Sequence, residues 1–87
     1  MSDYLQVAMN GARQGFDYDG PDRPAYASSL NGMAWLCGQW AAAKRETIES
    51  LKPSRGYSWR VALASGKNII LNFKDSRDWQ LPVEVQA

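Results

Sequence analysis

The sequence predicts a small α+β domain, in which two N-terminal helices, the second one long, precede a three-stranded antiparallel β-meander packed on the long helix. Apolar residues recur at three- and four-residue steps over residues 28–51, which is the period of a helix. Apolar and polar residues then alternate from residue 57 onward, which is the period of a strand. We expect a single domain over residues 1–87, with a helical part at 1–52 and the meander at 57–86.

The first helix is expected over residues 2–15, with Ser2 or Asp3 as its N-cap. Gly11 and Gly15 lie four residues apart and therefore share one face of this helix. Two interpretations of the pair are open. Gly15 can end the helix as a C-cap residue, or the two glycines can let another helix approach closely.

The segment 16–27 is predicted to be a loop, because it combines an Asp-Gly-Pro sequence with a second proline. Its carboxylates at Asp17, Asp19 and Asp22 form a compact acidic lip that a partner could bind. The spacing does not fit a calcium loop, which needs glycine at the sixth position and glutamate at the twelfth. Those positions hold Asp22 and Ser28, so we expect ordinary turn chemistry.

The second helix is predicted to run from Ser28 to Leu51. Ser28 or Ser29 can cap its start, and Pro53 stops the pattern after Lys52. This helix supplies the apolar surface that the predicted strands need as a packing partner.

Three side chains of the second helix carry further expectations. Cys37 lies on the apolar stripe, and we expect a buried, unreactive thiol. Trp35 and Trp40 lie five residues apart, about 140° around the helix axis, so both cannot centre one stripe. Either both pack against the first helix, or one is exposed and anchors a partner.

The meander is predicted from three runs of alternating residues, which place Trp59 and Trp79 on the core face and make Pro82 the mark of an edge strand. Alternation also predicts the register of the strands. The expected opposite pairs are Leu63 with Ile69, Val61 with Leu71, Trp59 with Phe73, Phe73 with Trp79, and Leu71 with Leu81.

Composition argues against several classes of function. The ten basic and nine acidic residues nearly cancel, whereas a dedicated nucleic-acid binder carries a marked basic excess. Histidine is absent and cysteine occurs once, so no disulfide within the chain, zinc site or Cys–His pair can form. We found no catalytic set and no cofactor motif, and we expect neither an enzyme nor a bound cofactor or metal. The chain shows no signal peptide and no apolar run that could span a bilayer, which predicts a cytoplasmic protein.

The first functional hypothesis is a small non-enzymatic protein-binding module. It would be an accessory or phage-type inhibitor, of the anti-CRISPR or host-takeover kind, that sterically blocks a host protein or complex. Open strand edges would also allow strand addition or a homodimer. The candidate partner-binding residues are Asp17, Asp19, Asp22, Tyr26, Trp35 and Trp40.

The second hypothesis is a ribosome-associated or RNA-binding regulator. Aromatic residues at Tyr57 and Trp59 interleave with some of the basic residues, as in RNA-facing patches. The candidate RNA-binding residues are Lys44, Arg45, Lys52, Arg55 and Arg60. The position of these side chains separates the hypotheses, because one continuous basic face favours RNA and a scatter among acids favours a protein partner.

A resemblance supports the second hypothesis. The chain carries Gly11-x-x-x-Gly15, then Pro24-Ala25-Tyr26, then Trp35-Leu36-Cys37-Gly38-Gln39-Trp40-Ala41. In these motifs residues 6–46 resemble the ribosome modulation factor family of bacteria and its small phage and plasmid relatives. The resemblance implies two closely packed helices and binding to the small ribosomal subunit, which promotes inactive ribosome dimers. The strands from Tyr57 onward have no counterpart in that family.

Overall fold

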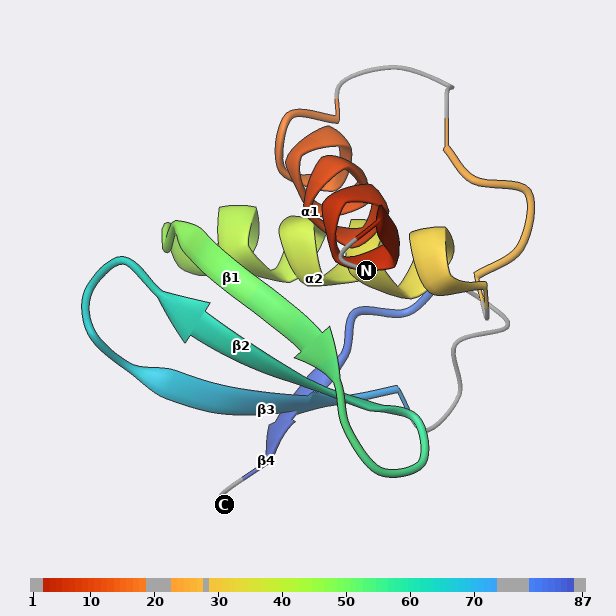
Figure 1. The fold of residues 1–87 in the computed structure, drawn as a ribbon. Helices are drawn as coiled ribbons and strands as arrows, with labels where there is room; N and C mark the ends of the chain where they lie inside the picture. Colours follow the sequence, from red (N-terminus) through yellow and green to blue (C-terminus); the bar gives the residue numbers. More distant parts are fainter. Residues whose placement is uncertain (1–2, 19–22, 28, 74–78, 86–87) are drawn as a thin grey trace.

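The structure, a computed structural model, describes residues 3–18, 23–27, 29–73 and 79–85. Its elements are α1 (Asp3–Phe16), α2 (Leu30–Lys44), β1 (Ile48–Pro53), β2 (Ser58–Leu63), β3 (Asn68–Asn72) and β4 (Val83–Val85). The two helices cover one face of a four-stranded antiparallel sheet in the order β1-β2-β3-β4 (Figure 1). The predicted α+β class is confirmed. No helix in the described ranges is long and apolar enough to cross a membrane.

The second helix ends at Lys44, so the prediction that it reaches Leu51 is wrong. Arg45 takes a left-handed conformation (φ 57°) that ends the helix, and its N–H donates to the carbonyls of the last turn. The following residues form β1, which makes the sheet four-stranded rather than three-stranded.

A β-bulge explains why the apolar residues of β1 have the spacing of a helix in the sequence. Ile48 pairs with Leu63 while Leu51 pairs with Val61, and the register shifts between these two pairs. Glu49 is the extra residue, so Ile48 and Leu51 face the same side although they lie three residues apart. That three-residue step is also the helical step, which is why the pattern predicted a helix here.

The start of α2 follows the predicted cap. The Ser29 hydroxyl accepts a hydrogen bond from the Gly32 N–H at 2.9 Å and donates one to the Tyr26 carbonyl at 2.7 Å. It thereby satisfies one of the free N–H groups at the helix start. The alternative cap of α2, Ser28, lies outside the described residues. The predicted N-caps of the first helix also cannot be compared, because Ser2 and the side chain of Asp3 lie outside what the structure describes.

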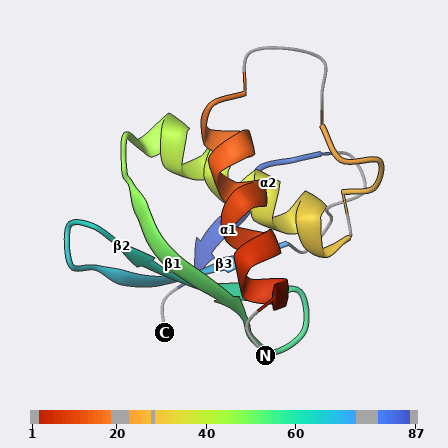
Figure 2. The same ribbon diagram turned by 45° about the horizontal axis from the view of Figure 1, so that its top comes forward.

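Glycine brings the two helices together where they cross (Figure 2). A Cβ atom on Gly15 would overlap the carbonyl oxygen of Trp35, and one on Gly38 would overlap the carbonyl oxygen of Ala12. Gly15 lies inside α1, which ends at Phe16. The close-approach interpretation is therefore correct for Gly15, whereas a Cβ on Gly11 would meet first the side-chain oxygen of Asn31 on α2.

Both helical tryptophans are buried, Trp35 at 2% and Trp40 at 5% exposure, so neither is the exposed anchor that one alternative predicted. The physical reason is that α2 contacts both α1 and the sheet and is buried on more than one side. Trp35 packs edge-on against Tyr18 and Trp79, with ring centroids 4.9 and 5.4 Å apart. Trp79 is half-buried against the core, as the alternation predicted, and Trp59 is fully buried within it.

The pairing of β2 with β3 keeps the predicted face but not the predicted partners. Trp59 lies opposite Leu71, and Val61 lies opposite Ile69. This register differs by two residues from the prediction, so the same side chains still point to the core.

The pairing of β3 with β4 reverses the predicted face of β4. Ile70 lies opposite Val85 and Asn72 opposite Val83, where Leu71 was expected to lie opposite Leu81. The difference is an odd number of residues, so both valines move to the outer face of the sheet. Trp79 has a left-handed backbone (φ 58°), and β4 begins only at Val83, so the alternation does not run through one straight strand. β4 is nonetheless an edge strand, as Pro82 predicted.

Cys37 is completely buried on α2, as predicted. Burial raises the pKa of its thiol above the ordinary value of 9.0, because the thiolate would lose its hydration. We expect iodoacetamide to spare Cys37 in the native chain at about pH 8.5 and to label it once the chain is unfolded. Mass spectrometry of the two samples measures this, and equal labelling in both would contradict a buried thiol.

The same shift sets the sign of a pH effect on stability. Above pH 9.0 the unfolded chain loses the thiol proton while the folded chain keeps it. Unfolding then releases a proton, so this group lowers the free energy of unfolding as the pH rises. Below pH 9.0 its contribution is constant.

Candidate functional site on the outer face of the sheet

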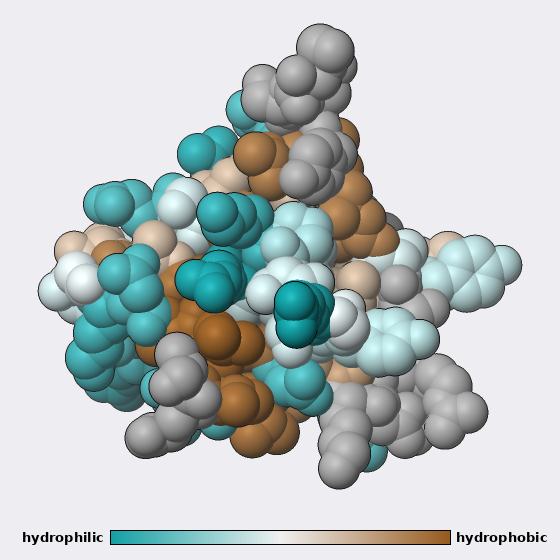
Figure 3. Space-filling view, turned by 60° about the horizontal axis from the view of Figure 1, so that its bottom comes forward, coloured by the Kyte–Doolittle hydropathy of each residue, from teal (hydrophilic) through white to brown (hydrophobic). Residues whose placement is uncertain are grey.

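The face of the sheet opposite the helices is covered by no other element of the described chain (Figure 1). Figure 3 views the molecule from this side and shows apolar residues that run from the centre to the lower edge of the view, with polar residues on both sides. By register, the side chains on this outer face are Ser50, Lys52, Ser58, Arg60, Ala62, Asn68, Ile70, Asn72, Val83 and Val85.

Four of these residues form one row across all four strands, which we call the outer row. Lys52 lies opposite Arg60, Arg60 opposite Ile70, and Ile70 opposite Val85. Neighbouring strands are about 4.8 Å apart, so the outer row is roughly 14 Å long. It passes from two cations on β1 and β2 to two aliphatic side chains on β3 and β4.

The two cations of the outer row stand directly opposite each other. Like charges in this position destabilise a sheet. The ion pair found among the described residues joins Lys67 to Glu46 at 4.0 Å, and no described carboxylate pairs with Lys52 or Arg60. Arg55, exposed in the turn after β1, adds a third positive charge at this end of the sheet. An anionic group bound here would relieve the repulsion.

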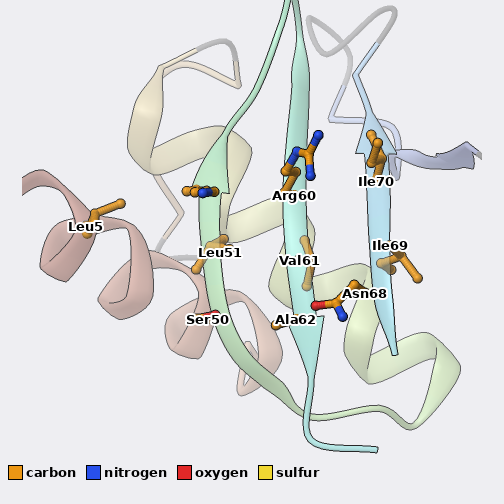
Figure 4. A pocket seen from close by; sticks show the side chains of 10 residues that line it. Leu5, Ser50, Leu51, Arg60, Val61, Ala62, Asn68, Ile69 and Ile70 are labelled. Carbon is orange, nitrogen blue, oxygen red and sulfur yellow. The ribbon is translucent and has the colours of Figure 1, made fainter. Parts of the chain in front are cut away.

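A shallow groove of about 490 Å³ follows the first half of the outer row (Figure 4). Residues of three strands and one residue of α1 line it. The apolar ones are Leu5 of α1, Leu51, Val61, Ala62, Ile69 and Ile70. The polar ones are Ser50, Lys52, Arg60 and Asn68. Beside the groove the Asn72 amide donates a hydrogen bond of 2.9 Å to the Ser58 hydroxyl, which ties β3 to β2 on this face.

The second half of the outer row is apolar and accessible. Val85 is 43% exposed, and its neighbour Val83 is 66% exposed on the same face. Ile70 between them and the cations is half-buried. Exposed aliphatic side chains next to charged ones are typical of a contact surface for another molecule.

The structure does not bring the predicted partner-binding residues together. Trp35 and Trp40 are buried and contribute nothing to the surface. Tyr26 is 73% exposed in the connection before α2. Asp17 is exposed beside a smaller cavity of about 280 Å³ between α1 and β1. The remaining two carboxylates of the acidic lip, Asp19 and Asp22, lie outside the described residues.

The predicted RNA-binding residues separate into two groups. Lys44 and Arg45 lie at the end of α2, next to the start of β1 (Figure 1). Lys52, Arg55 and Arg60 gather at the far end of β1, a six-residue strand roughly 17 Å long. The five basic side chains therefore do not form one continuous face.

Sequence reasoning missed the apolar half of the outer row. The signal for Ile70 was its position next to Ile69, because two successive apolar residues in a strand put one on each face. No comparable signal marked Val83 and Val85, since their alternation fits either face.

Among the described residues, no group of three or more His, Cys, Asp or Glu is placed to hold a metal ion. Comparison of the chain with known protein families, with curated proteins and with solved structures found no match.

Proposed function

We propose that this chain is a non-enzymatic protein-binding module of the accessory or phage-inhibitor type. It blocks a host protein or complex by laying the outer face of its sheet on the surface of that partner. The observation that supports this is the outer row, where two opposed cations without a described acidic partner adjoin exposed aliphatic side chains. Charged groups of this kind steer a partner, and apolar groups beside them contribute affinity.

The face of the sheet offers more surface than its edges. The edge of β1 contacts α1, and β4 is three residues long. Strand addition at either edge would gain few main-chain hydrogen bonds. We therefore place the contact on the outer face.

The chemistry of the face favours protein over nucleic acid. Proteins that bind single strands stack bases on exposed aromatic side chains. The outer row offers Ile70 and Val85 instead, and Trp59 on β2 is buried in the core. Tyr57 is exposed, but it lies in the turn before β2 and outside the outer row. The net charge of +1 gives no long-range attraction for phosphate.

A ribosome-associated or RNA-binding regulator is the second candidate, favoured by the three cations at one end of the sheet. Affinity capture of the tagged chain from a bacterial lysate, with and without nuclease, separates the two functions. The first predicts one enriched host protein or complex that resists nuclease and is absent from an untagged control. The second predicts ribosomal proteins that disappear on nuclease treatment. Capture of neither kind would contradict both.

A further inference from the structure

We infer that the partner segment is acidic at one end and aliphatic at the other: a carboxylate lies between Lys52 and Arg60, and two aliphatic side chains cover Ile70 and Val85. This inference rests on the proposed function and names the chemistry of the partner. It assigns each half of the outer row to one part of the same segment.

The carboxylate follows from the charges. Both cations project from neighbouring strands onto one face, so a single carboxylate between them can accept hydrogen bonds from both. Binding would exchange a repulsion within the sheet for two attractions across the interface. A neutral partner would leave that repulsion in place.

The spacing of the segment follows from the geometry of the sheet. The midpoint of the two cations lies roughly 7 Å from Ile70, since strands are about 4.8 Å apart. Alternate residues of an extended chain are also about 6.7 Å apart. An extended segment that crosses the strands therefore fits with an acidic residue, then aliphatic residues two and four positions later. The second aliphatic side chain reaches Val85, which is 43% exposed.

The test is an NMR titration of the ¹⁵N-labelled full chain with the probe peptide acetyl-Glu-Thr-Val-Thr-Val-amide. The matched control peptide carries glutamine in place of glutamate, and a uridine oligonucleotide is the third probe. We expect amide shifts at Lys52, Arg60 and Ile70, with the glutamine peptide binding roughly three- to tenfold more weakly. In the K52Q/R60Q variant the two peptides should bind equally.

Three results would overturn the inference. The first is equal binding of both peptides to the unaltered chain, and the second is no amide shift at these residues. The third is an oligonucleotide that shifts the amides of the outer row at lower concentration than the glutamate peptide, which would assign the face to nucleic acid. A different result would contradict the proposed function: affinity capture from the lysate that yields no nuclease-resistant protein. Capture of a protein without any preference for the glutamate peptide would retain the function and reject the inference.

Discussion

Replacing Gly38 with alanine is expected to lower the free energy of unfolding by about 3 kcal/mol. The added Cβ would overlap backbone atoms of α1, the carbonyl oxygen of Ala12 and the amide nitrogen of Phe16. A backbone cannot rotate aside as a side chain can, so the two helices would have to separate along their contact. A domain of this size loses about 4–8 °C in Tm per kcal/mol. Thermal and urea unfolding followed by circular dichroism would measure the loss.

Two other glycines provide matched controls. A Cβ on Gly11 would mainly meet the side-chain oxygen of Asn31, which can move, so Gly11→Ala should cost at most about 1 kcal/mol. A Cβ on Gly56 would meet no described atom within 4 Å. Gly56→Ala should therefore lower the free energy of unfolding only through the strain of a positive φ of 61°, about 1 kcal/mol. If Gly38→Ala is no more destabilising than these two, the close helix contact is not what requires glycine.

The K52Q/R60Q double variant is expected to lose capture of the host partner and still to be as stable as the unaltered chain or more so. Glutamine keeps a polar side chain with an aliphatic stem, although a shorter one, and removes both charges. Loss of the opposed charges should raise the free energy of unfolding by roughly 0.2–1 kcal/mol. Loss of the cationic contacts should weaken partner binding at least about tenfold. Urea unfolding and quantitative affinity capture measure the two effects separately.

A second double variant controls for net charge. R13Q/K44Q removes one arginine and one lysine that are exposed but lie outside the sheet, on α1 and at the end of α2. It should retain capture. If both double variants lose capture equally, overall charge rather than the outer row governs binding. A clear fall in the stability of K52Q/R60Q would show that Lys52 and Arg60 serve the fold instead.

The helices and the core could be predicted from the sequence because apolar spacing and caps are local signals. The end of α2 could not, because a bulge at Glu49 gives Ile48 and Leu51 the three-residue spacing of a helix. Only pairing with β2, a contact made across the fold, selects the strand. The burial of both Trp35 and Trp40 could not be predicted either, because it depends on contacts of α2 with both α1 and the sheet.

Half of the candidate site was present among the predictions. Lys52 and Arg60 are both among the basic residues that the sequence predicts to bind RNA. That the two stand opposite each other in the sheet depends on β1 being a strand. The apolar half depends on a register that alternation leaves open, because a shift of one residue exchanges the two faces. The acidic and aromatic residues were predicted to bind a partner because of their chemical type. Burial and register, however, decide which side chains reach the surface.

The order of the strands has a consequence for how the chain is made. Each strand neighbours the next one in the sequence, so the sheet can grow stepwise as the chain leaves the ribosome. The outer row takes one residue from every strand, and Val85 on β4 is the last to arrive. A nascent or truncated chain that lacks β4 would present the two cations and Ile70 without Val85. The outer row would thus be complete only after β4 has been made and has paired with β3.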